Sequence, residues 1–195
     1  MTALLTASDL TRSYRAGRGS LLRAAPRFNA VDGVDVAVAR GETLAIVGES
    51  GCGKSTLGSL LLGLAEPTRG RVLFAGAPVR ARRASDWRRM RRRVQVIFQD
   101  TSGSLDPRLP VFTQVREPLL IHRIGDRAER ERKTAAILSA VGLGEHLWQR
   151  VPGELSGGQQ QRVVIARAAI LEPELIVCDE PVSALDVSIQ AQVLR

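Results

Sequence analysis

The fold of this 195-residue chain is decided by the stretch Thr43-Leu-Ala-Ile-Val47, Gly48-Glu-Ser-Gly-Cys-Gly53-Lys54-Ser55. The first five residues form a short apolar run, which is typical of a buried parallel strand. The next eight match the pattern G-x-x-x-x-G-K-[ST] of a phosphate-binding loop. The leucine-rich residues 55–64 then predict a helix with leucines on its buried side. Strand, glycine-rich turn and helix in this order predict an α/β fold with a phosphate site at the helix N-terminus.

The residue types in this loop suit the binding of a phosphate chain. Glycines let backbone N–H groups wrap around phosphates at φ values that other residues resist. We expect Lys54 to reach the β- and γ-phosphates of a nucleotide and the Ser55 hydroxyl to ligate Mg²⁺. The predicted ATP-binding residues of the loop are Gly48, Glu49, Ser50, Gly51, Cys52, Gly53, Lys54, Ser55 and Thr56.

A second apolar run, Leu175–Cys178, ends in the acidic pair Asp179 and Glu180. At the carboxyl end of a strand, Asp179 is predicted to hold Mg²⁺ through water, and Glu180 to polarise the attacking water as general base. Paired acids after a strand are also common as plain turn residues. The phosphate loop upstream favours the metal-binding interpretation.

Composition and charge restrict the class of protein. With 44% hydrophobic and 25% charged residues, the chain has the profile of a soluble globular protein. No apolar stretch approaches the length of a spanning helix, and no signal peptide is readable. The two cysteines, Cys52 and Cys178, make no disulfide framework, which agrees with a reducing cytosol.

The net charge of +8 is carried almost wholly by arginine, and eight arginines fall between Arg80 and Arg93. Such a run is either a solvated basic helix face or a binding site for nucleic acid or anionic lipid. The solvated face is the simpler interpretation.

The order of the expected elements divides the chain into three parts. A β region and phosphate-loop core span residues 1–98, a helical insertion spans 99–157, and a helix followed by the acidic pair spans 158–195. Strands are expected at residues 71–74 and 94–98, with the arginine-rich helix between them, and helices at 126–141, 159–171 and 186–195.

The motif Leu155-Ser-Gly-Gly158-Gln159 resembles the signature motif of ATP-binding cassette (ABC) ATPases. A simpler interpretation is that Ser156 only caps the following helix. The resemblance implies that this motif closes over the γ-phosphate of ATP held by a second ABC ATPase subunit, in a head-to-tail homo- or heterodimer. The residues in these positions are Ser156, Gly157, Gly158 and Gln159.

The same resemblance assigns three further residues. Gln99 is in the Q-loop position, where the family couples metal and water to the transport partner. Asp186 ends a D-loop, Ser183-Ala-Leu-Asp186, that faces the P-loop of the partner subunit. Tyr14 is in the place of the aromatic residue that stacks on adenine, although it also fits a half-buried strand position.

A finer resemblance is to the ATPase subunits of oligopeptide, dipeptide and nickel importers. It rests on residues 98–108, 117–119, 156–162 and 179–194, with Asp106 and Gln160 as departures. It implies an ATPase coupled to transmembrane transport, on the cytoplasmic face of the membrane. Its partners would be permease subunits and, indirectly, a solute-binding protein, with no direct contact to nucleic acid.

One family element, a switch histidine beyond the acidic pair, has no counterpart here, because neither His122 nor His146 lies in that position. We therefore expect a P-loop ATPase core with a mostly parallel sheet, an N-terminal antiparallel β region and a helical insertion, truncated at the C-terminus. Two alternatives stay open. One is a truncated cassette that binds nucleotide without hydrolysing it, and the other is an ABC ATPase that grips nucleic acid through the arginine run.

Overall fold

The computed structural model describes residues 3–15, 26–79, 84–100 and 102–179. The chain divides into two units, Met1–Trp87 and Arg88–Arg195, and each is described by itself. The expected positions Glu180 and Asp186, and the expected helix 186–195, lie outside the described residues. None of the described helices is long and apolar enough to cross a membrane.

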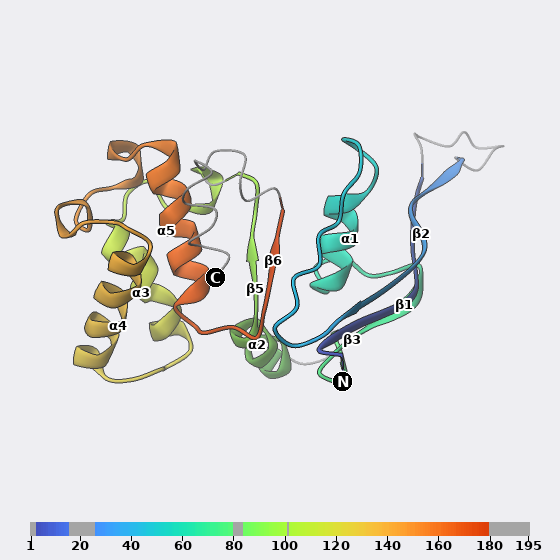
Figure 1. Cartoon of the computed structure of the whole chain (residues 1–195), viewed down its shortest axis with the longest axis horizontal. Coiled ribbons are helices and arrows are strands. Elements are labelled where there is room, and N and C mark those ends of the chain that lie inside the picture. The colour runs from blue at the N-terminus through green and yellow to red at the C-terminus, as the bar shows by residue number, and fades with distance from the viewer. Residues whose placement is uncertain (1–2, 16–25, 80–83, 101, 180–195) are drawn as a thin grey trace. The chain divides into compact units, whose positions relative to one another are not determined.

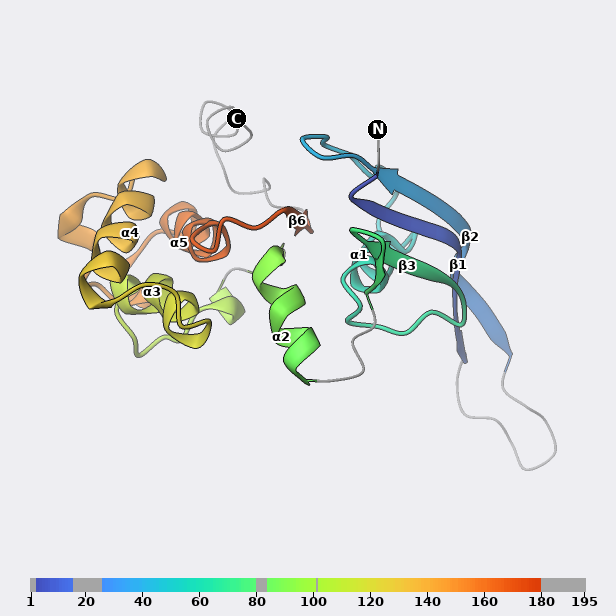
Figure 2. The ribbon, with the colours of Figure 1, turned by 90° about the horizontal axis from the view of Figure 1, so that it is seen from below.

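The first unit is built on an antiparallel sheet (Figures 1 and 2), which confirms the predicted N-terminal β region. Its strands, in the spatial order β2-β1-β3-β4, are β1 (Leu5–Arg15), β2 (Arg27–Val38), β3 (Arg69–Phe74) and β4 (Ala77–Pro78). The register pairs Leu5 with Val38 at one end of β1 and Tyr14 with Phe28 at the other. Helix α1 (Lys54–Leu61) contacts β2 and buries Leu57 among its leucines.

The prediction of a buried strand at residues 43–47 was wrong. This segment forms no regular structure, and Leu44, Ile46 and Val47 are exposed, Val47 to 91%. A strand needs a neighbour to take up its backbone N–H and C=O groups, and no described residue pairs with this segment. An apolar run indicates that a segment favours burial. Whether that segment forms a strand depends on a neighbouring strand that pairs with it.

The second unit contains a parallel pair of strands, β5 (Val94–Ile97) and β6 (Leu175–Cys178), both predicted from the sequence. Helix α2 (Ala84–Arg93) leads directly into β5, and Arg93 forms an ion pair with Glu174 immediately before β6. The expected full burial of β6 was wrong, because Ile176 is 41% exposed. Within the described part of the chain β6 pairs only with β5, so no described strand pairs with its other edge.

Helices make up the rest of the second unit, and Figure 1 shows α5 beside α3 and α4. They are η1 (Ser102–Ser104), α3 (Val111–Ile121), α4 (Arg127–Ala140), η2 (Glu145–Leu147), η3 (Pro152–Glu154) and α5 (Gly157–Ala169). Helix α5 contacts α3, α4 and β5. Its Val163 and, from the other helices, Val115, Leu119 and Leu138 are fully buried in one core. The predicted charged helix is confirmed as α4, capped by Asp126.

Candidate functional site

The phosphate loop opens onto the N-terminus of α1. Gly51 and Gly53 have φ values of 80° and 100°, in the left-handed region that favours glycine. A Cβ on Gly53 would also stand 2.1 Å from the carbonyl oxygen of Ala30 in β2. Gly53 is therefore required both for the turn and for the close approach of the loop to β2.

Lys54 folds back over this loop. Its Nζ donates hydrogen bonds of 2.8 Å to the carbonyl oxygens of Gly48 and Glu49. The first-turn N–H groups of α1 have no acceptor within the helix, and no acidic side chain lies in that turn. An ammonium group and helix N–H groups at one loop form an arrangement that binds anions such as phosphate.

The remaining loop residues lie around this arrangement. Cys52 Sγ is 3.9 Å from Lys54 Nζ, and a Cβ added at Gly48 would stand only 2.7 Å from that sulfur. A larger residue at position 48 would therefore require the Cys52 side chain to move. Exposed side chains around it are those of Glu49, Ser50 and Ser55, and Thr56 is half-buried.

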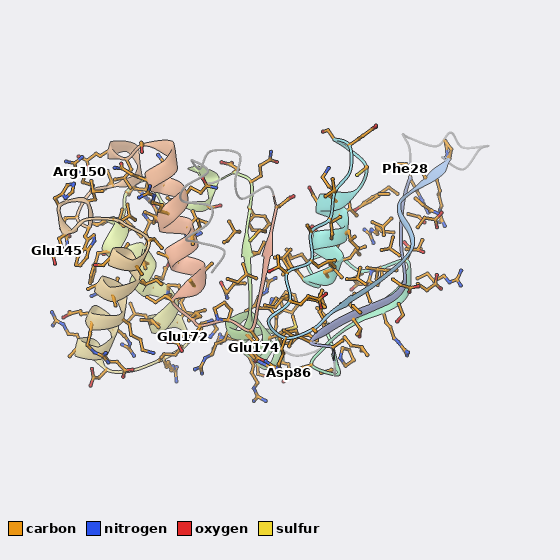
Figure 3. All side chains as sticks on the ribbon, in the orientation of Figure 1. Phe28, Asp86, Glu145, Arg150, Glu172 and Glu174 are labelled. Carbon is orange, nitrogen blue, oxygen red and sulfur yellow. The ribbon has the colours of Figure 1, made fainter. Side chains whose placement is uncertain are left out.

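An aromatic pair lies across β1 and β2, and β2 is the strand that the loop approaches at Ala30. Tyr14 in β1 and Phe28 in β2 are cross-strand partners with ring centroids 5.9 Å apart, and Phe28 is labelled in Figure 3. Phe28 is 52% exposed and Tyr14 37%. The Arg12 guanidinium lies over the Tyr14 ring, 4.8 Å from its centroid. Phe28 was missed in the sequence, because only the β1–β2 register brings it to Tyr14.

Gln99 and Asp179 come together at one edge of the parallel pair. Gln99 follows β5, Asp179 follows β6, and the Asp179 N–H donates to the Ile97 carbonyl oxygen at 2.9 Å. The carboxyl ends of neighbouring parallel strands meet at the same edge, so the Gln99 amide and the Asp179 carboxylate share it. Both side chains carry the oxygen ligands that Mg²⁺ prefers.

A cavity of about 250 Å³ lies within the second unit, and Phe98, the residue before Gln99, is part of its lining. Its lining includes Gln95 and Phe98 from the β5 segment, Glu117 from α3 and Arg167 from α5. Burial lowers the pKa of Arg167, and the charge of Glu117 opposes this shift. The cavity thus combines an exposed aromatic ring with two opposite charges, a lining suited to a protein segment with apolar and polar side chains.

The simpler interpretation of Ser156, a helix cap, is observed at the start of α5. The Ser156 hydroxyl accepts a hydrogen bond from the Gln159 N–H, and the Gln159 Oε1 accepts one from the Ser156 N–H. Gln160 donates to the carbonyl oxygens of Pro152 and Leu155 and so ties the preceding turn to the helix. These bonds fix the conformation of the loop that carries the predicted signature residues.

The fold of α5 does not explain why residue 157 is a glycine. A Cβ there would meet no described atom within 4 Å, and its φ is not positive. Glycine here leaves the surface of the helix N-terminus bare, which leaves room for another molecule to approach it.

Comparisons with known proteins agree with this geometry. A family model described as ABC transporter matches residues 31–183. The chain is 47% identical, over all of its length, to a di/tripeptide transport ATP-binding protein, DppF, of Pseudomonas aeruginosa. It is 44% identical over 98% of its length to an oligopeptide transport ATP-binding protein, AppF, of Bacillus subtilis. It spans only 60% and 59% of the lengths of these two relatives.

Among solved structures, the chain resembles the ATP-binding cassette MJ0796 in a dimeric, post-hydrolysis state with bound ADP and Pi. The TM-score is 0.84 at 30% identity, covering 97% of this chain and 79% of the other. This likeness confirms the predicted α/β P-loop fold class. The two peptide-transport relatives confirm the predicted resemblance to that group of ATPase subunits.

Proposed function

Since the chain belongs to the ABC transporter family, we propose that it is the nucleotide-binding part of an ATPase subunit that powers the import of peptides or related small solutes. The observation that carries the proposal is the loop at the N-terminus of α1, where Lys54 Nζ and the first-turn N–H groups gather around Gly48–Ser55. The identity to peptide-transport proteins of two bacteria supports the solute class.

The nucleotide phosphates bind the loop, and the base stacks on the aromatic pair. Lys54 then exchanges its bonds to the Gly48 and Glu49 carbonyl oxygens for bonds to the β- and γ-phosphates. The close approach of Gly53 to Ala30 supports this assignment, because Ala30 lies only two residues after Phe28 in β2. We therefore add Phe28 to Tyr14 as a contact of the base.

Ser55, Gln99 and Asp179 are the residues that would hold Mg²⁺. Hydroxyl, amide and carboxylate oxygens fit this ion, which is usually bound by few protein groups together with substrate phosphates. When bound, Mg²⁺ neutralises charge on the phosphates during transfer. Glu180 takes a proton from the attacking water, and Gln99 orients that water.

The signature residues act on the nucleotide of a second subunit in a head-to-tail dimer. Ser156 and the backbone of Gly158, with Gly157 and Gln159, approach its γ-phosphate. The bare surface at Gly157 and the dimeric state of the similar cassette support this arrangement. Asp186 faces the P-loop of the same partner subunit.

The chain binds its permease subunits on the cytoplasmic face of the membrane. A solute-binding protein delivers the solute to these permease subunits. The cavity lined by Phe98 is a suitable contact for a permease segment, because Phe98, Glu117 and Arg167 offer apolar and charged groups together. A segment held there would contact Phe98, the residue directly before Gln99, which we assign to metal and water. This adjacency links docking to hydrolysis.

Nucleotide binding is tested with Lys54→Ala, measured by equilibrium binding of a fluorescent ATP analogue. Loss of charge-assisted hydrogen bonds to phosphate should weaken binding by about 10- to 100-fold. The control is Lys133→Ala, since Lys133 is the chain's other lysine and interacts with Glu129 and Glu172 in the second unit. Equal affinity of Lys54→Ala and the unchanged chain contradicts the assignment of the loop.

The role of Phe28 is tested with Phe28→Ala by comparing the affinities for ATP and for tripolyphosphate. Stacking on an aromatic ring contributes about 1–3 kcal/mol per base, so ATP affinity should fall at least fivefold. Affinity for tripolyphosphate should not change, and Phe28→Tyr should retain ATP binding. A parallel loss for both ligands would show that Phe28 acts only through the fold of the hairpin.

The solute class is tested in the source organism by placing Lys54→Ala in the chromosomal gene. Growth on di- and tripeptides as the sole source of a required amino acid should be lost, while growth on the free amino acid is retained. Normal peptide growth together with loss of another nutrient would assign the subunit to another solute. Unchanged growth on all nutrients would contradict a role in import.

A further inference from the structure

Helix α2 carries a basic face that the proposed function does not use. Its arginines are Arg88, Arg89, Arg91, Arg92 and Arg93, and its only acidic residue is Asp86. Two of the five are engaged by the fold. Arg93 pairs with Glu174, and Arg91 is half-buried, which lowers its pKa.

The other three arginines, Arg88, Arg89 and Arg92, are exposed. None of them forms an ion pair with a residue that the structure describes. Arg88 and Arg92 are one helical turn apart and so lie on the same side of α2. We call these three residues the α2 basic face.

The C-terminal end of α3 lies within electrostatic reach of this face. Burial lowers the pKa of His122, the residue that follows α3, and the positive charges of Arg92 and Arg88 lower it further. Directly before His122, Ile121 is 56% exposed, and directly after it, Arg123 is also exposed. An exposed aliphatic side chain is thus adjacent in sequence to a histidine that interacts electrostatically with Arg88 and Arg92.

We propose that the α2 basic face, together with Ile121 and Arg123, binds the surface of a membrane that contains anionic phospholipids. Guanidinium groups form charge-assisted hydrogen bonds with phosphate oxygens, as in lipid headgroups. An aliphatic side chain beside them enters the interface between headgroups and acyl chains. Clusters of several basic residues on one helix are typical of segments that bind anionic lipid.

Nucleic acid fits the same surface less well. Single strands are bound by stacking bases on aromatic rings beside basic groups. The aromatic residue of α2 is Trp87, which is half-buried and packs near Gly63. An exposed isoleucine gains little from a phosphate backbone, whereas it gains from a lipid interface.

The test is co-sedimentation of the 195-residue chain with vesicles of phosphatidylcholine alone or with added phosphatidylglycerol. We expect binding only to vesicles with phosphatidylglycerol. Each arginine near an anionic surface contributes about fivefold in partition, so Arg88→Glu/Arg92→Glu should bind at least about 25-fold more weakly. Ile121→Ser should also weaken binding, without any change of charge.

The matched control is Arg132→Glu/Arg150→Glu, in which two exposed arginines away from α2 are reversed. Both double variants change the net charge from +8 by the same amount. Circular dichroism verifies folding, and Arg88→Gln/Arg92→Gln replaces the first variant if it unfolds.

Two results would overturn the proposal. The first is equal loss of vesicle binding in the α2 and control variants, which would mean that only net charge matters. The second is undiminished vesicle binding by the α2 variant. If that variant also loses binding to a DNA duplex, the face is assigned to nucleic acid.

Discussion

Gln114 is expected to hold the turn that leads from Gln99 to α3. It is only 2% exposed, and its side chain forms three hydrogen bonds with backbone groups of that turn. The Oε1 accepts from the Asp106 N–H at 2.9 Å, and the Nε2 donates to the carbonyl oxygens of Asp106 and Leu109 at 3.0 and 2.8 Å. Gln114→Met keeps the size of the side chain and removes all of these bonds.

The expected loss of stability in Gln114→Met follows from the number of hydrogen bonds removed and from how exposed their partners are. A typical intramolecular hydrogen bond contributes about 0.5–1.5 kcal/mol net, and a buried polar group left unpaired costs about 1–3 kcal/mol. Asp106 and Leu109 are half-buried, so water replaces part of what is lost. We therefore expect the free energy of unfolding of the second unit to fall by about 2 kcal/mol.

The assay is urea unfolding followed by the fluorescence of Trp148. A local probe is needed, because the chain has two units and need not unfold in one step. The Trp148 ring lies 5.6 Å from that of Phe112 in α3, so its emission reports on this packing. Measurements are made in a Trp87→Phe background, and hydrogen exchange at the Asp106 amide gives a second, residue-level readout.

Gln161→Met is the matched control. Gln161 is also a buried glutamine, 3% exposed, but its Oε1 has no hydrogen-bond partner among the described residues. Its replacement should change the unfolding free energy by less than about 1 kcal/mol. Equal shifts in the two variants, or unchanged exchange at Asp106 in Gln114→Met, would refute the reasoning.

Two further predictions concern the same unit. Leu138→Ala should lower the unfolding free energy of the second unit, measured by urea unfolding, by about 2–5 kcal/mol, because loss of the fully buried side chain leaves a cavity in the core. A smaller decrease would mean that the neighbouring side chains collapse to fill the cavity. The hydrogen bonds from Arg108 lower the pKa of Asp106 to about 2 from 3.8, so their stabilisation is present above pH 3.8 and is lost as the pH falls towards 2. Arg108→Gln should make the urea midpoint less dependent on pH in that window, and an unchanged pH profile would show that the pair is not formed in solution.

Features set by local sequence were predictable. The phosphate loop, the Asp126 cap of α4 and the strands around residues 94–98 and 175–178 each depend on a few neighbouring residues. Capping, turn glycines and short apolar runs act over one or two helical turns, so a single sequence carries them. The predicted residues Gln99 and Asp179 share a sheet edge for the same reason, since each directly follows a predicted strand.

Features that depend on pairing over long distances were not predictable. The apolar residues 43–47 suggested a strand, but strand formation needs a partner that the segment itself does not specify. Phe28 reaches Tyr14 only through the antiparallel register of β1 and β2. The bonds of Gln114 likewise depend on the path of the turn before α3, and a lone glutamine gives no signal of them.

Ser156 allowed two interpretations in the sequence, as a helix cap and as a contact for the phosphate of a partner subunit, and its hydroxyl chemistry makes them compatible. A serine hydroxyl has one O–H to donate and two lone pairs that accept. The cap uses it as an acceptor, because the Gln159 N–H donates to Oγ. The O–H donates to no acceptor among the described residues, and Ser156 is exposed, so this proton is available to a phosphate oxygen from outside the chain. Aspartate at this position would cap the helix equally well and repel the phosphate. The cap therefore holds the Ser156 hydroxyl in place for the contact that we propose with the partner's nucleotide.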